Sequence, residues 1–126
     1  MTADDLRDWC LGRLGAEETF PFNASTSVFK VRGRMFALSA LSEEPLRVSV
    51  KCDPDYAEEL REGHESIIPG YHLNKRHWIT VTVGGDARDD LVRELIADSH
   101  ALVRSRGRPP GSPRAARPRS RRRAIG

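Results

Sequence analysis

Apolar residues near the N-terminus recur every three or four positions, which is the spacing of one face of a helix. The residues of this face are Leu6, Trp9, Cys10 and Leu14. A Thr2–Asp5 pair of the capping-box type stands before them, and Gly15 follows as a helix stop. The pattern predicts a first helix over residues 3–14, with Cys10 buried as a small apolar side chain.

Between residues 25 and 51 the period of the pattern changes to two, which is typical of strands. Gly33 and the Ser-Glu-Glu-Pro run at 42–45 divide this stretch as turns would, so we predict three antiparallel strands in a meander. Successive side chains of a strand point to opposite faces, and the cations should therefore share one face. The apolar set is Phe29, Val31, Val48 and Val50, and the cationic set is Lys30, Arg32, Arg47 and Lys51.

Three further elements complete the predicted order. Asp53 before Pro54 starts a second helix, which ends near Gly63. Residues 78–83 are rich in β-branched side chains and predict a strand, after which Asp86 caps a third helix. The apolar stripe of that helix comprises Leu91, Leu95, Ile96, Leu102 and Val103. The predicted fold class is α+β, in the order α-β-β-β-α-β-α.

Composition bounds the class of protein. The 126 residues are 38% hydrophobic and 31% charged, which suits one soluble globular domain. No apolar stretch approaches the roughly 20 residues of a transmembrane helix, and the N-terminus is acidic where a secretory signal would be basic. We therefore expect a cytoplasmic protein. Two cysteines far apart in the chain, Cys10 and Cys52, argue against a disulfide framework.

Charge divides the chain into two parts. Residues 104–126 hold nine arginines and no acid, whereas residues 1–103 hold 12 Lys and Arg against 18 Asp and Glu. The net charge of +3 is thus +9 on the arginine-rich segment and −6 on the remainder. That segment is also rich in proline and has no apolar period, so we predict a globular domain over 1–103 and a disordered tail over 104–126.

Within the predicted domain, acids occupy the helical segments, and bases occupy the strands and the loop before the last strand. A sheet with helices on its apolar face would leave a basic, open surface on the other side. Such a surface suits phosphate or another acidic partner, although a solvated strand face has the same composition. The pattern alone leaves both interpretations open.

Residues 68–78 are the densest in chemistry, with two imidazoles, an amide, two cations and two aromatic rings. The run PGYHLNKRHW at 69–78 closely resembles the signature of the MmcQ/YjbR family of small bacterial proteins. Residues 29–37, 48–51 and Asp53-Pro54 resemble that family's strands and second helix. So does Phe20-Pro21-Phe22, which by pattern alone we expect in a loop packed on the core. The resemblance covers residues 1 to about 105 and excludes the arginine-rich segment, and Leu73 stands where the family more often has Met.

The resemblance implies a two-layer fold with an antiparallel sheet, made of the meander and one or two further strands, and helices on one face. It also implies DNA binding, which is how members of the family are usually described. The residues expected to contact DNA are Lys30, Arg32, Arg34, Arg47, Lys51, His72, Asn74, Lys75, Arg76, His77 and Trp78, together with Arg117, Arg119, Arg121, Arg122 and Arg123 of the tail. Most would contact phosphates. The imidazoles and Asn74 could also reach base edges, and Trp78 could support the loop or stack on a base.

Several alternatives use the same residues. The open sheet could instead bind an acidic peptide as a protein-interaction module. Tyr71, Trp78 and the two imidazoles could be structural, packing the loop or satisfying buried backbone groups. A metal at His72 and His77 would need Cys52 or an acid to complete it. No nucleophile motif, carboxylate pair or phosphate-binding glycine loop accompanies them, so we expect neither catalysis nor a cofactor.

Overall fold

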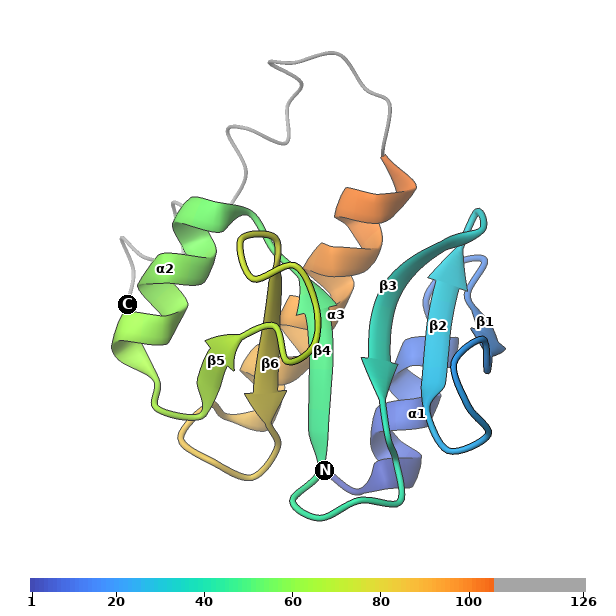
Figure 1. Ribbon diagram of the computed structural model, residues 1–126, viewed down its shortest axis with the longest axis horizontal. Helices are drawn as coiled ribbons and strands as arrows, with labels where there is room; N and C mark the ends of the chain where they lie inside the picture. The colour runs from blue at the N-terminus through green and yellow to red at the C-terminus, as the bar shows by residue number, and fades with distance from the viewer. Residues whose placement is uncertain (106–126) are drawn as a thin grey trace.

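The computed structural model describes residues 1–105, which form a six-stranded antiparallel sheet and three helices (Figure 1). The strands are β1 (Glu17–Thr19), β2 (Ser27–Val31), β3 (Arg34–Ser39), β4 (Arg47–Lys51), β5 (Ile67–Pro69) and β6 (Trp78–Thr82). The helices are α1 (Ala3–Leu11), α2 (Pro54–Gly63) and α3 (Asp89–Arg104). The sheet order is β1-β2-β3-β4-β6-β5, and the predicted α+β class is confirmed. Residues 106–126, with the five tail arginines named above, lie outside the described residues.

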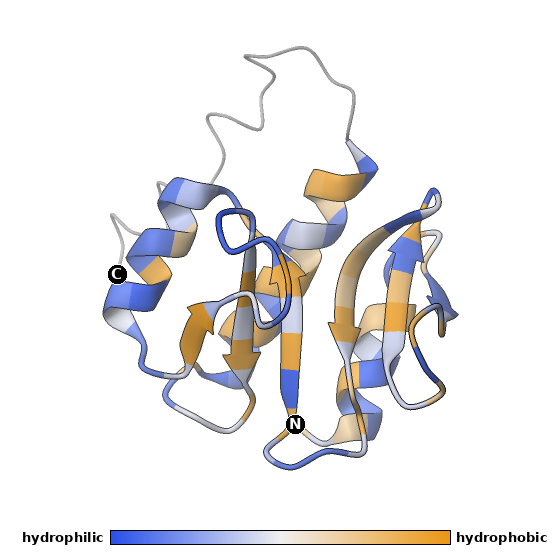
Figure 2. Cartoon of the chain, in the orientation of Figure 1, coloured by the Kyte–Doolittle hydropathy of each residue, from blue (hydrophilic) through white to orange (hydrophobic). Residues whose placement is uncertain are grey.

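The helices lie on one side of the sheet. Helices α1 and α3 run behind the strands in Figure 1, with α3 packed on β3 and β4, and α2 lies along β5. The strong orange of the strands in Figure 2 marks the apolar residues that supply most of this core. No helix within residues 1–105 has the length and apolar content needed to cross a bilayer.

The sheet register confirms the predicted alternation. Phe29, Ala37, Val50 and Ile79 are paired across the four central strands and lie buried in the core beneath the helices. The neighbouring row comprises Val28, Leu38, Ser49 and Thr80 and lies on the opposite face. That opposite face carries no helix, and we call it the open face (Figure 1).

A serine of α3 bridges the two halves of the sheet beside their direct pairing. β3 and β4 pair only at Ala37↔Val50 and Leu38↔Ser49, and β3 then bends away from β4. Continued in register, Phe36 would face Lys51. Instead the fully buried Ser99 of α3 donates its hydroxyl to the Phe36 carbonyl (2.6 Å) and accepts from the Lys51 amide (2.9 Å). A side-chain hydroxyl therefore takes the place of a strand-to-strand bond.

The first helix is shorter than predicted. It ends at Leu11. The Gly12 amide donates to the Asp8 carbonyl (2.9 Å), the Arg13 amide donates to the Cys10 carbonyl in a tighter turn (3.2 Å), and Leu14 is left 71% exposed. The capping box at its start is confirmed, and so is the burial of Cys10.

Two short strands stand where loops were expected. Residues 17–19 form β1, held on β2 by the bond from the Thr19 hydroxyl to the Val28 carbonyl. The prediction that Phe20 and Phe22 pack on the core is wrong. Both lie in the segment between β1 and β2, where they are 51% and 61% exposed. At the other edge, β5 pairs with β6.

Asp86 does not cap the third helix, which is a correction. The helix begins three residues later, at Asp89, behind Arg88. Asp86 instead accepts bonds from the amides of Glu65 and Ser66 and from the Ser66 hydroxyl, and these bonds lower the pKa of its carboxyl. The aspartate thus fastens the loop before β5 to the loop before α3.

We expect Ser99→Ala to lower the free energy of unfolding by about 1–3 kcal/mol, because it leaves a buried amide and a buried carbonyl without partners. Chemical denaturation followed by circular dichroism measures the change. The matched control is Ser42→Ala, which removes an exposed hydroxyl and should change stability by less than about 0.5 kcal/mol. Equal stability of the two variants would contradict the bridging role of Ser99.

Candidate functional site

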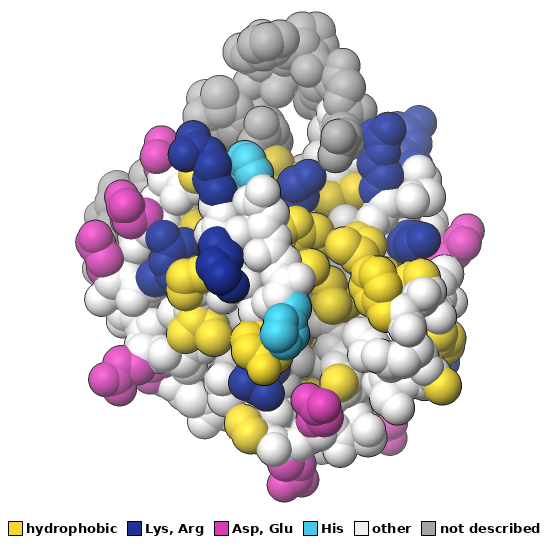
Figure 3. Space-filling view, viewed as in Figure 1, with side chains coloured by type: hydrophobic (Ala, Val, Ile, Leu, Met, Phe, Trp, Pro, Cys, Tyr) yellow, Lys and Arg dark blue, Asp and Glu magenta, His cyan; other side chains and the backbone are white. Residues whose placement is uncertain are grey.

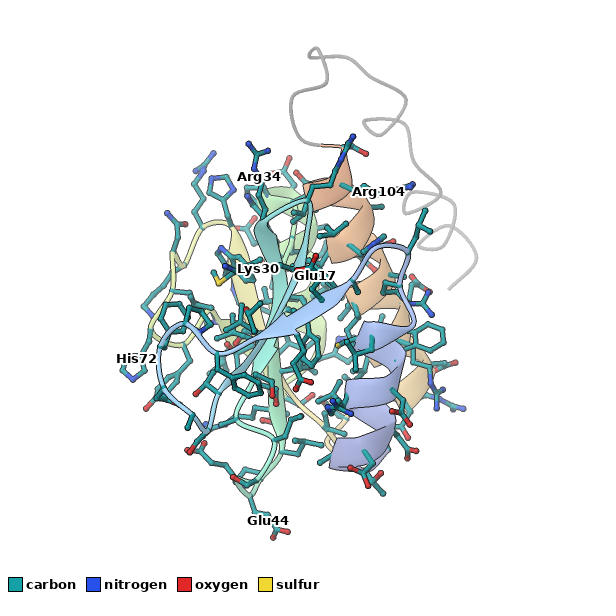
Figure 4. All side chains as sticks on the ribbon, turned by 90° about the vertical axis from the view of Figure 1, so that its right-hand side faces the viewer. Glu17, Lys30, Arg34, Glu44, His72 and Arg104 are labelled. Carbon is teal, nitrogen blue, oxygen red and sulfur yellow. The ribbon has the colours of Figure 1, made fainter. Side chains whose placement is uncertain are left out.

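Cations from four separate segments lie at one end of the sheet. We call Arg32, Arg34, Lys51, Arg76 and Arg104 the basic end. They come from the β2–β3 turn, the end of β4, the loop before β6 and the last turn of α3. The Arg32 side chain donates to the Arg104 carbonyl (3.1 Å), and the pairing of Lys51 with Trp78 brings the residues just before Trp78 to the same end. Figure 4 shows Arg34 and Arg104 together, with Glu44 at the opposite end.

Three guanidinium groups of the basic end have no carboxylate partner among residues 1–105. Arg32, Arg34 and Arg76 form no ion pair with any carboxylate of residues 1–105. The ion pairs Met1–Asp89, Arg7–Glu18 and Arg88–Asp90 belong to α1, β1 and the start of α3. Figure 3 shows many of the Lys and Arg side chains along the upper margin of the open face, with hydrophobic side chains in its middle.

The loop between β5 and β6 is held by its own polar side chains. Lys75 donates from Nζ to the Gly70 carbonyl (2.8 Å), and the Asn74 side-chain oxygen accepts from the amides of Arg76 (2.9 Å) and His77 (3.1 Å). Gly70 crosses so close to Trp78 that a Cβ on the glycine would lie 2.6 Å from the tryptophan Cβ. The loop therefore requires glycine at this point.

These contacts show how several residues of the predicted DNA surface are used within the domain. Trp78 is only 8% exposed, so its ring supports the loop and is not presented for stacking on a base. Asn74 and Lys75 use their polar atoms on the backbone of the loop. Arg76 and His77 remain exposed beside the basic end. Lys30 lies on the open face, one strand in from the edge and paired in register with Glu17 (Figure 4).

The first half of the same loop covers a cavity of about 570 Å³ on the open face. We call it the open-face cavity. Its lining is Phe22, Asn23, Thr26, Leu38, Ser39, Ala40, Glu43, Arg47, Ser49, Tyr71, His72, Leu73 and Thr80. On its floor the hydroxyls of Ser49 and Thr80 are 2.7 Å apart, and Thr80 also accepts from the Tyr71 amide (2.9 Å).

Arg47 and His72 thus lie apart from the other predicted residues. The Arg47 guanidinium lies over the Tyr71 ring at 5.4 Å. The imidazole of His72 lies against the same ring, tilted by 51°, with the ring centroids 4.0 Å apart. His72 has a left-handed backbone (φ 60°) and protrudes from the open face in Figure 4. Sequence reasoning treated these residues as one surface with the basic end, whereas the fold separates them.

Sequence reasoning also missed most of the cavity. Leu38 and the Ser49–Thr80 pair were not singled out, and Phe22 was expected to pack on the core. The available signal was the alternation itself, since Ser49 and Thr80 occupy polar positions between buried valines and isoleucine in two strands.

The cysteines and histidines form no second site in the part of the chain that the structure describes. Burial raises the pKa of the Cys10 thiol to about 12, so the thiol stays protonated at neutral pH. Residues 1–105 contain no group of three or more His, Cys, Asp or Glu side chains that could hold a metal ion.

Comparisons with known proteins agree on one family. The YjbR family model matches residues 11–102. YbdF of Escherichia coli O157:H7 is 39% identical over 87 residues (69% of this chain and 71% of that protein). YjbR of E. coli K12 is 34% identical over 100 residues (79% and 85%).

Solved structures support the same assignment. The crystal structure of the Deinococcus radiodurans protein DR2400, with domain DUF419, has a TM-score of 0.80 and 45% identity, and it covers 90% of this chain and 86% of that one. A Pseudomonas syringae crystal structure shares the fold at a TM-score of 0.70 and 24% identity, covering 82% and 99%. The match to the family model and the identity to the two relatives show that this chain belongs to the YjbR family.

Proposed function

We propose that the protein binds DNA through its phosphate backbone, with the basic end and the arginine-rich segment acting as one surface. The observation that carries this proposal is the contact between Arg32 and the Arg104 carbonyl. It places the start of the nine-arginine stretch, which begins at Arg104, beside the exposed cations of the sheet.

The charge distribution supports the proposal better than the total charge does. Residues 1–103 carry a net −6, and a long duplex would be repelled by most of that surface. At the basic end, however, exposed guanidinium groups have no carboxylate partner among residues 1–105. Arginine matches phosphate with two parallel hydrogen bonds, which makes this end the favourable place of approach.

The same contacts favour binding with little sequence preference. Sequence is read by side chains that reach base edges, whereas phosphate contacts only position a protein. Trp78 is buried under the β5–β6 loop, and the side-chain oxygen of Asn74 accepts two amides of the same loop, so two of the predicted base-contacting side chains are partly or wholly used by the loop. The five residues of the basic end are all cations, and we expect them to act mainly on phosphates.

The salt dependence of binding tests the arginine-rich segment. Full-length protein should bind a short duplex with a log–log salt slope of about −6 to −8, a loss of roughly 10³- to 10⁵-fold between about 50 and 200 mM salt. A chain ending at residue 105 keeps every strand and helix of the sheet domain and should lose nearly all of this affinity. Fluorescence anisotropy measures both. Tight binding of one DNA sequence by the shortened chain would contradict the proposal.

Charge reversal tests the basic end. Arg34→Glu with Arg76→Glu in the full-length chain should weaken DNA binding about tenfold or more and reduce the salt slope by about 2. Neither side chain holds the fold together, unlike those of Arg32 and Lys75. The matched control is Arg61→Glu with Arg88→Glu. It makes the same change in charge in the last turn of α2 and just before the start of α3, away from the basic end.

The control variant should bind DNA nearly as the parent does. Equal losses in both variants would mean that only net charge matters and that the basic end has no special role. A glutamate-rich peptide serves as competitor in the same assay. If it displaces DNA as well as an oligonucleotide of equal charge does, the surface is a peptide-binding module of the kind the sequence also allowed.

A further inference from the structure

The open-face cavity has the volume of a small-molecule site and lies apart from the basic end. Its volume of about 570 Å³ falls within the range of ligand pockets, roughly 300–1,000 Å³. Its lining includes segments from both edges of the sheet. Phe22 and Asn23 follow β1 at one edge, and Tyr71 and His72 follow β5 at the other.

The cavity floor offers a hydrogen-bond donor that the protein does not use. Ser49 and Thr80 carry two hydroxyl hydrogens, and their mutual bond of 2.7 Å uses one of them. The Tyr71 amide also donates to Thr80 and fills an acceptor position of that hydroxyl, and within residues 1–105 the second hydrogen has no acceptor. Both side chains are more than 90% buried, so this hydrogen requires an acceptor from whatever fills the cavity.

A cation stands beside this donor. Arg47 lines the cavity, and its guanidinium forms no ion pair with the carboxylates of residues 1–105. The Tyr71 ring, 5.4 Å away, holds it in place. A guanidinium beside a hydroxyl donor is the arrangement that binds a carboxylate in proteins. Glu43 lines the same cavity and disfavours a doubly charged anion such as a phosphate monoester.

Aromatic side chains supply the walls. Phe22 is 61% exposed and Tyr71 52% exposed, although both are large apolar groups that normally bury most of their surface. They approach the cavity from opposite edges of the sheet, and Leu38 lies between them on its floor. Two aromatic walls favour a ligand with a flat aromatic ring, because contacts between aromatic rings add to the binding energy from buried area.

We propose that the open-face cavity binds a small aromatic monocarboxylate. The carboxylate lies on Arg47 and the Ser49–Thr80 pair, and the ring lies between Phe22 and Tyr71. This site is independent of the proposed DNA surface, since it uses none of the residues of the basic end.

The test is a titration of the nitrogen-15-labelled full-length chain with sodium naphthalene-2-carboxylate, followed by NMR. We expect saturable shifts of the amides of Ser49, Tyr71, His72 and Thr80. Arg47→Met should weaken binding about tenfold or more, because it removes a charged, two-pronged hydrogen bond. The matched control is Arg88→Met, whose side chain is 87% exposed at the start of α3, and it should leave the affinity unchanged.

Two milder variants keep the test valid if Arg47→Met loosens the loop over Tyr71. Ser49→Ala removes one of the two hydroxyls on the cavity floor without changing charge and should weaken binding several-fold. Arg47→Lys keeps the charge and loses the planar fork, so its affinity should fall between those of the parent and Arg47→Met. Naphthalene-2-carboxamide should bind at least about tenfold more weakly than the carboxylate.

The proposal is overturned if no saturable shift appears at millimolar carboxylate, if the amide binds as well as the carboxylate, or if Arg47→Met binds as the parent does. Naphthalen-2-yl phosphate binding more tightly than the carboxylate would replace the ligand class and equally overturn it. The Arg34→Glu, Arg76→Glu variant should keep full carboxylate affinity, so failure at one surface is distinguishable from failure at the other.

Discussion

The two halves of the sheet meet at one joint, between β3 and β4, which the Ser99 hydroxyl bridges. The two strands pair directly at only two positions before β3 bends away. Ser99 spans the opening between the Phe36 carbonyl and the Lys51 amide and fixes α3 on both strands at once. Every other element is placed relative to this joint, because β1 and β2 attach through β3, and β6 and β5 through β4.

The joint also fixes the two candidate surfaces. α3 ends beside the β2–β3 turn, which brings Arg104 to Arg32 and assembles the basic end. The hydroxyl floor of the cavity lies on β4 and β6, on the face away from α3. One alternation of side chains along β4 thus serves both purposes, since Val48 and Val50 build the core while Arg47 and Ser49 face the cavity.

The main elements could be predicted because their patterns are long and regular. The meander and the second helix were found close to their observed bounds. The two edge strands were missed, because three residues are too few to show a period. The role of Ser99 was not predictable either. A single serine among the apolar residues of a helix does not show from the sequence that its hydroxyl bridges two strands. The cavity joins Phe22, Arg47 and Tyr71 from distant parts of the chain, and only the sheet order brings them together.

The short edge strands have a consequence for self-association. An exposed strand edge offers unpaired amides and carbonyls that another chain can extend. Here one edge is three residues long and begins with Glu17 and Glu18, and the other is three residues long and ends at Pro69, which has no amide hydrogen to donate. Neither edge gives a foreign strand a template, so growth into fibrils by strand addition is blocked at both margins of the fold.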